Sequence, residues 1–131
     1  MRLLLDTHVW VWSLERPEKL SHKVRRAIGN PANELYLSPI SIWEAHQLYR
    51  RGKLRWKQSF QELIDQAFAL APLREAPFNF AVAREASRIQ LPQADPGDVF
   101  LAASASVLDL TLVTADAQLI ACSWLKTLAN R

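Results

Sequence analysis

The segment RLLLDT, residues 2–7, places a short apolar run directly before an acidic residue. A continuous apolar run of this length is typical of a strand that is buried on both faces of a sheet. The segment LTLVTAD, residues 110–116, has the same form, with Asp116 shortly after the apolar run. We therefore expect two buried strands, Arg2 to Leu5 and Leu110 to Val113, each followed by an acid.

Working outward from these two segments, apolar spacing and the positions of Gly and Pro predict the other elements. Further strands are expected at Leu35 to Leu37, near Leu73 and, at an edge, from Trp124 to Leu128. Helices are expected over Ser13 to Ile28, Pro39 to about Arg51, Phe60 to Ala71, Asn79 to Gln90, from Asp95-Pro96 to Leu108, and briefly after Asp116. Strands that alternate with helices predict an α/β fold with a central parallel sheet and right-handed crossovers.

Length and composition indicate one domain over residues 1–131 with a packed core, since half of the residues are hydrophobic and 22% are charged. The single cysteine, Cys122, excludes an internal disulfide and a zinc site of the paired-cysteine kind. No run approaches the length of a membrane helix, and the amino terminus lacks the features of a signal peptide. We therefore expect a soluble, cytoplasmic protein with no membrane partner.

A basic segment begins at the end of the helix predicted from Pro39 and continues toward the helix predicted from Phe60. It contains Arg50, Arg51, Lys53, Arg55 and Lys57, interleaved with Trp56. On charge alone a solvated helix end is the simpler interpretation, and the net charge of +3 permits a nucleic-acid partner without requiring one. The alternative is a surface that contacts phosphates, with Trp56 stacking on a base or packing in the core.

Four acids follow or begin four separate elements. Asp6 and Asp116 come after the two buried strands, whereas Glu44 and Asp98 lie in early turns of predicted helices. In a parallel sheet the carboxyl ends of all strands meet at one edge, where ligand sites form. Each acid taken alone is explained as well by helix capping, for instance by a capping box from Ser41 to Glu44. Together they predict one acidic site.

Converging carboxylates repel one another and need a cation or protons to compensate their charge. A ligand set made only of oxygens favours Mg²⁺ or Mn²⁺, which bind phosphate oxygens and lower the pKa of bound water. Such a site hydrolyses phosphodiesters without a histidine base or a covalent nucleophile. His8 and His46 lie close in sequence to two of the acids, either as neighbours of the site or as local hydrogen-bonding residues, whereas His22 is expected at the surface.

Four motifs in this order resemble those of PIN-domain ribonucleases, and specifically of the VapC-like toxins of bacterial toxin–antitoxin pairs. The first is LLLDTH, residues 3–8, and the second is LSPISIWE, residues 37–44, followed by RGKL at 51–54. The third is DPGD, residues 95–98, with LAA at 101–103, and the fourth is LVTAD, residues 112–116. Order and spacing agree with the family along nearly the whole chain.

The resemblance implies a three-layer α/β/α fold and a metal-dependent endoribonuclease that leaves a 5′-phosphate. It implies metal ligation and catalysis by Asp6, Glu44, Asp98 and Asp116. Asp95, Thr114 and Thr7 would be accessory residues, and the basic segment, with Arg50, Arg51, Lys53, Arg55 and Trp56, would bind RNA. It further implies a homodimer and a cognate antitoxin protein that covers the active site.

The third motif departs from the family pattern. Gly97 and Val99 stand where the family often has Phe and Arg, and Gln93-Ala94 replaces a His-Arg pair. These changes leave open a second hypothesis, a PIN-like module that binds RNA or protein without cutting. A third hypothesis, a phospho-acceptor signalling domain, would need paired acids after the first strand and a lysine after the last, whereas here Asp6 stands alone and Lys126 is loosely placed.

Overall fold

The strands form one five-stranded sheet in the order β3-β2-β1-β4-β5, and every neighbouring pair is parallel in this computed structural model of residues 1–131. The strands are β1 (Arg2–Leu5), β2 (Glu34–Leu37), β3 (Leu73–Glu75), β4 (Thr111–Thr114) and β5 (Thr127–Ala129). The helices are α1 (Thr7–Glu15), α2 (His22–Gly29), α3 (Pro39–Arg50), α4 (Phe60–Leu70), α5 (Phe80–Ala86), α6 (Pro96–Leu108) and α7 (Ala117–Ile120), with a 3₁₀ turn at Pro17–Lys19.

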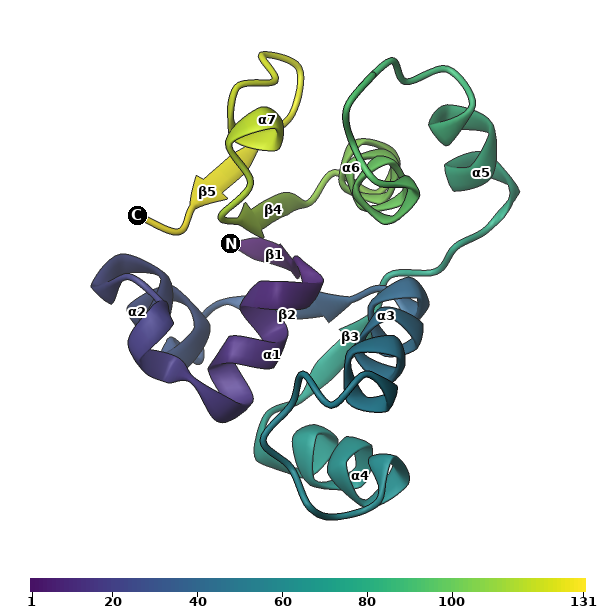
Figure 1. The fold of residues 1–131 in the computed structure, drawn as a ribbon. Coiled ribbons are helices and arrows are strands. Elements are labelled where there is room, and N and C mark those ends of the chain that lie inside the picture. The colour runs from purple at the N-terminus through teal and green to yellow at the C-terminus, as the bar shows by residue number, and fades with distance from the viewer.

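The sheet is the middle of three layers, as the sequence predicts. Leu3 and Leu5 of β1 pack into one apolar cluster with residues of α1, α2 and α4, whereas Leu4 between them packs into a second cluster with residues of α6 and α7. Helices α1 and α2 accordingly lie on one side of the sheet, and α6 and α7 lie on the other (Figure 1). Burial on both faces explains why the central strands are apolar without alternation.

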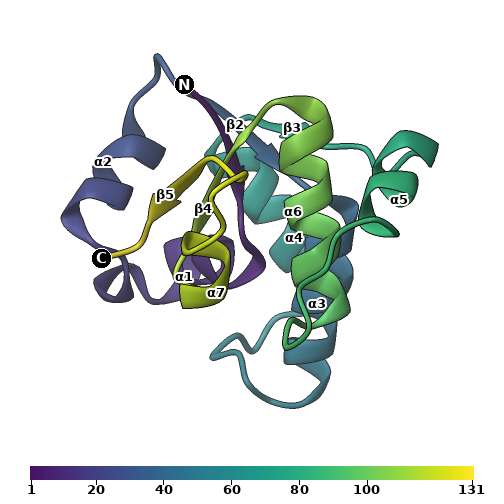
Figure 2. The same cartoon turned by 90° about the horizontal axis from the view of Figure 1, so that it is seen from above.

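Strand β1 is the centre of the sheet and sets the register. Leu4 lies opposite Tyr36 of β2 on one side and Leu112 of β4 on the other. Because β1 and β4 are neighbours, the residues that follow them in the chain emerge side by side at the same edge. Helices α3 and α6 run close to each other beside this edge, with α5 at the outside of the molecule (Figure 2).

The prediction of one helix over Ser13 to Ile28 was wrong. Helix α1 begins directly after Asp6 and ends at Glu15, and α2 is separate. Pro17 begins the 3₁₀ turn between them, and Ser21 starts α2 afresh, since its side chain accepts a hydrogen bond from the Val24 N–H. A proline and a new N-cap thus override the continuous polar–apolar alternation of the segment.

Two shorter predictions also needed correction. Helix α5 ends at Ala86 and does not continue to Gln90. The last strand is Thr127–Ala129 and does not begin at Trp124, which is half-exposed in the preceding turn. Strand β5 pairs with only one neighbour, so its position depends on β4 and is poorly marked by its own short sequence. None of the helices has the length and apolar composition needed to cross a membrane.

Replacing Leu4 by Ala should lower the free energy of unfolding by ~2–5 kcal/mol, because a fully buried side chain leaves a cavity at the centre of the sheet. Urea unfolding followed by circular dichroism measures the change. The matched control is Leu70→Ala, since Leu70 is 77% exposed and its loss should change stability by less than about 0.5 kcal/mol. Equal losses in both variants would contradict the placement of the core.

Candidate active site

Asp6 and Asp116 emerge beside each other from the paired strands β1 and β4. The Asp6 N–H donates to the Val113 carbonyl at 3.0 Å, so the chain is still hydrogen-bonded to β4 when it leaves the sheet. Asp6 is only 7% exposed. Asp116 begins α7 and its Oδ1 accepts from the Leu119 N–H at 3.0 Å. Sheet pairing alone therefore brings these two carboxylates, 110 positions apart in sequence, to one place.

Thr114 connects the two acids. Its buried hydroxyl donates to Oδ2 of Asp6 at 2.6 Å and accepts from the Asp116 N–H at 3.0 Å. One hydroxyl thus fixes the rotamer of Asp6 and the backbone turn that carries Asp116. This geometry supports the accessory role that the motif resemblance implies for Thr114.

Glu44 reaches the same place from α3. The helix begins at Ser38, whose hydroxyl accepts from the Ile40 N–H at 3.1 Å, and Pro39 occupies the first turn. Glu44 then lies in the second turn, where the Thr7 hydroxyl donates to its Oε1 at 2.6 Å. The Thr7 hydroxyl also lies 2.9 Å from that of Ser41, which is fully buried. Thr7 therefore links the start of α1 to α3.

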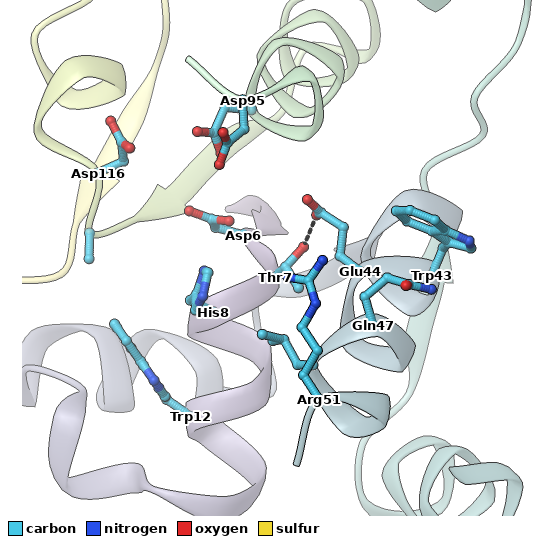
Figure 3. Close-up of a pocket in the computed structure, with 13 residues that line it drawn as sticks. Asp6, Thr7, His8, Trp12, Trp43, Glu44, Gln47, Arg51, Asp95 and Asp116 are labelled. Carbon is cyan, nitrogen blue, oxygen red and sulfur yellow. Dashed lines mark hydrogen bonds between the residues drawn. The ribbon is translucent and has the colours of Figure 1, made fainter. Parts of the chain in front are cut away.

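Asp95 and Asp98 come from the start of α6. Asp95 is the N-cap residue and Asp98 lies in the first turn, with the Asp98 N–H donating to the Asp95 carbonyl at 3.0 Å. Both residues line the same cavity as Asp6, and the close-up view shows Asp95 beside Asp6 (Figure 3). Negative charge at this end of a helix is favoured by the helix dipole.

A side-chain capping hydrogen bond explains one of these acids, Asp116, and does not explain the others. Asp116 does cap α7. Asp6 and Asp95 occupy N-cap positions, yet their side chains accept no capping hydrogen bond. The alternative explanation of Glu44 by a capping box with Ser41 does not apply, because Ser38 is the N-cap and Ser41 lies inside the helix. The simpler explanation for Asp6, Glu44 and Asp95 is therefore removed.

The acids share one cavity of about 520 Å³ at the carboxyl edge of the sheet (Figure 3). It is lined by Asp6, Thr7, His8, Trp12, Trp43, Glu44, Gln47, Leu48, Arg51, Asp95, Asp98, Ala115 and Asp116. The lining contains five carboxylates and one guanidinium. The structure thus brings together all four of the predicted acidic residues with accessory Asp95 and Thr7, while Thr114 lies buried behind Asp6.

Several lining residues were not predicted from the sequence. Gln47 and Leu48 follow Glu44 at spacings of three and four, so they share its face of α3. Arg51, which is among the predicted RNA-binding residues, continues this face at a spacing of seven, directly after the helix. Trp12 is related to His8 by four residues in α1 in the same way. Extending the helical face from each predicted site residue would have found these neighbours. Trp43, 63% exposed, lies at the rim.

The basic segment divides into one residue at the cavity and others away from it. Arg51 extends along the cavity wall toward Thr7 (Figure 3). Arg50, Lys53, Arg55 and Lys57 are exposed outside the lining. Trp56 is half-buried against the apolar cluster of α1 and α4, which favours the core interpretation. His46 stacks against Phe60 at 4.9 Å between ring centroids and is not in the lining, whereas His22 is exposed.

Burial and mutual repulsion raise the pKa of three carboxyl groups in the cavity. Desolvation is the main cause for Asp6, opposed by the hydrogen bond from Thr114. Desolvation also raises the pKa of Glu44, against the hydrogen bond from Thr7. For Asp98, desolvation and the charges of Asp6, Asp116, Asp95 and Glu44 raise the pKa to about 6. The site therefore carries electrostatic repulsion at neutral pH.

The donor set fits a hard divalent cation in its chemistry, because it consists of carboxylate oxygens whose repulsion a cation would relieve. Asp6, Glu44, Asp98 and Asp116 are the residues that would hold it. No group of three or more His, Cys, Asp or Glu side chains stands close enough in this arrangement to hold one ion. Binding would therefore require movement of some of these side chains.

The acidic cavity lies at the carboxyl edge of a parallel α/β sheet, which is where ligand sites form in folds of this class. The sequence model of the PIN domain matches residues 3–124 of the chain. The chain belongs to the PIN domain family, as its four motifs predict. A comparison with curated proteins gives no match.

Solved structures share the fold over nearly the whole chain. The DNA-bound VapBC from Salmonella typhimurium superposes with a TM-score of 0.71 at 15% identity, covering 98% of both chains. FitAcB from Neisseria gonorrhoeae gives 0.66 at 22% identity, covering 98% of this chain and 97% of the other. VapBC-5 from Mycobacterium tuberculosis, a member of the VapBC family of toxin–antitoxin systems, gives 0.63 at 16% identity, covering 98% of both.

Removing the charge of Asp98 should stabilise the protein in the absence of divalent metal. The pKa of Asp98 in the folded protein, about 6, lies above the ordinary aspartate pKa of 3.8, so the folded protein retains this proton where the unfolded chain has lost it. Stability of the parent should therefore rise as the pH falls through 6 toward 4. Asp98→Asn lacks this penalty, and its thermal midpoint in EDTA should exceed the parent's by a few degrees at pH 7.5.

The difference between the two proteins should shrink as the pH approaches 4.5. Differential scanning fluorimetry across this range measures it. The control is Asp65→Asn, because Asp65 is an exposed acid on α4 outside the cavity. If Asp98→Asn melted below the parent at pH 7.5 without metal, the inferred repulsion would be absent.

Proposed function

We propose that the protein is a divalent-metal-dependent endoribonuclease. The observation that carries the proposal is the convergence of five carboxylates from four separate parts of a PIN domain on one cavity. Membership of this family supports nuclease activity in general terms. Dependence on Mg²⁺ or Mn²⁺ and the choice of RNA are the further steps that we propose.

The chain's own residues divide the work of the site. Asp6, Glu44, Asp98 and Asp116 would hold the ion, while the hydroxyls of Thr114 and Thr7 hold Asp6 and Glu44 in position from outside. A bound Mg²⁺ or Mn²⁺ would supply an activated water and neutralise charge developing on the phosphodiester. Asp95, beside Asp98, adds negative charge that favours retention of the cation.

The substrate would approach the cavity beside Arg51. This guanidinium makes no salt bridge with the protein and no side-chain hydrogen bond, so it is free to contact a backbone phosphate. Arg50, Lys53 and Arg55 are exposed outside the cavity and would contact phosphates of a longer RNA chain. The half-buried Trp56 would then anchor the basic segment by packing against the apolar cluster of α1 and α4.

The similar structures support a toxin role. They are complexes named VapBC and FitAcB, and one of them is described as a toxin–antitoxin system. We infer that this chain is the toxin of such a pair, with a cognate antitoxin protein as its partner and a homodimer as its assembly. The resemblance of the four motifs to VapC-like toxins supports the same inference.

An alternative function is a PIN-like module that binds RNA or a protein without cutting. Two observations favour it: the departures at Gly97 and Val99, and the absence of any three acids arranged to hold one ion. Calorimetric titration with Mn²⁺ distinguishes the two functions, because a degenerate site should bind the ion feebly while RNA binding persists.

Cleavage of a total RNA pool should give discrete products with Mg²⁺ and none with EDTA. Asp98→Asn should reduce the rate by on the order of 100-fold or more, because the charge that stabilises the cation is lost. Gel electrophoresis of the products over time measures both effects. Asp65→Asn should cleave like the parent, since Asp65 lies on α4 outside the cavity. The nuclease proposal fails if the folded parent protein, free of antitoxin, cuts no RNA with Mg²⁺ and none with Mn²⁺.

Replacing Arg51 by Ala should raise KM several-fold with a smaller change in kcat, because one phosphate contact is lost while the acids are untouched. The dependence of RNA affinity on salt should also weaken by about one unit of log–log slope. Fluorescence anisotropy at several salt concentrations, with metal withheld, measures the slope. The control is Arg84→Ala, an exposed arginine on α5. An unchanged slope in Arg51→Ala would remove Arg51 from the binding surface.

A further inference from the structure

Gly97 is the one glycine of the chain whose missing side chain makes room for a neighbour. A β-carbon at this position would lie 2.8 Å from Cδ of Glu44 and nearer still to its Oε2, closer than the 3.0 Å that real β-carbons respect. At Gly29 and Gly52 a β-carbon would meet nothing within 4 Å. The carboxylate of Glu44 thus lies in a notch on the surface of α6 that exists only because residue 97 is glycine.

Backbone conformation does not explain this glycine. Gly52 has a positive φ of 68°, a backbone conformation that favours glycine. Gly97 lies within the first turn of α6 and is buried, where alanine would be the better helix former. The reason for glycine at position 97 is therefore the close approach of Glu44.

The Glu44 carboxylate is held from two sides. On one side the Thr7 hydroxyl of α1 donates to Oε1 at 2.6 Å. On the other side the carboxylate lies against α6 at Gly97, where an added β-carbon would overlap Oε2 and the carboxyl carbon. Figure 3 shows Glu44 reaching from α3 into the space between Thr7 and the start of α6, toward Asp6 and Asp95. Three helices thereby meet on one carboxylate.

We propose that Gly97 is a positioning residue, which keeps the Glu44 carboxylate in the active site by leaving the notch on α6 open. In this chain the glycine of the third motif is then part of the site, because it accommodates the carboxylate of Glu44. The inference rests on the proposed nuclease function for its kinetic readout. It predicts that any side chain at position 97 displaces Glu44 toward solvent and away from Thr7.

The test is a double-mutant cycle between positions 97 and 44. Gly97→Ala should lower kcat for RNA cleavage by on the order of 10–100-fold, because a displacement of about 1 Å at a reacting site has effects of this size. KM should change little. Gly29→Ala is the matched control, because it makes the same substitution in a helix where the β-carbon meets nothing, and it should cleave like the parent.

Glu44→Asp is the second single variant of the cycle. The aspartate side chain is one methylene shorter, so its carboxylate should not reach the notch at Gly97. In that background Gly97→Ala should cause no further loss of kcat. An equal loss in both backgrounds would overturn the proposal, because Gly97 would then act independently of Glu44. Full activity of Gly97→Ala in the presence of Glu44 would overturn it as well.

A structural readout separates this proposal from the nuclease function. In a crystal structure of metal-free Gly97→Ala, the Glu44 carboxylate should have left hydrogen-bonding distance of the Thr7 hydroxyl. If that contact remained, the positioning role would be wrong even for an active enzyme. If the parent cleaved no RNA but the contact was broken in the variant, the nuclease proposal would fail while the steric pairing of Gly97 and Glu44 stood.

Discussion

Five carboxylates lie together at one edge of the sheet and repel one another. The rest of the structure has to hold these side chains together against that repulsion. Parallel pairing of β1 with β4 forces Asp6 and Asp116 together, and two helices add Glu44, Asp95 and Asp98. The repulsion is offset by packing elsewhere, in two apolar clusters that cover both faces of the sheet. The core therefore has to be continuous and well packed for the acidic edge to persist.

Short polar side chains hold this edge in place. Thr114 and Thr7 each use a single hydroxyl to fix one carboxylate at 2.6 Å. Both threonines are buried, with exposures of 0% and 3%, so their hydrogen bonds are protected from competing water. Orientation by neutral hydroxyls, without cationic partners, leaves the negative charge of the acids available to a cation.

The fold and the four acids could be predicted because each depends on local sequence. Buried strands are continuous apolar runs, and acids after them must lie at the carboxyl edge. Helix boundaries were less accessible, since the division of Ser13 to Ile28 depends on Pro17 and on a new cap at Ser21. Strand β5 depends on its pairing with β4. The sequence also allowed a capping box at Ser41 as the alternative role for Glu44, and the structure excludes it because Ser38, three residues earlier, is the N-cap.

Features of the site that depend on three-dimensional approach could not be predicted. Gly97 stood out in the sequence as a departure from the third motif, but its closeness to the Glu44 carboxylate is visible only in three dimensions. Arg51 stood among five basic residues of similar appearance, and the helical face of Glu44 distinguishes it from the others. Trp56 was open between stacking and core packing until its contacts with the apolar cluster were visible.

The side chain of Asp116 both caps α7 and brings a carboxylate to the cavity. These two roles use different atoms, so they can be tested separately. Its Oδ1 accepts the Leu119 N–H that starts α7, which leaves Oδ2 for the cavity. Asparagine retains an oxygen that can cap a helix, whereas alanine does not. An amide at this position would therefore preserve the local fold while removing the charge. At Asp116, a single substitution can therefore keep the helix cap while it removes the negative charge from the cavity. Asp6 makes no such cap.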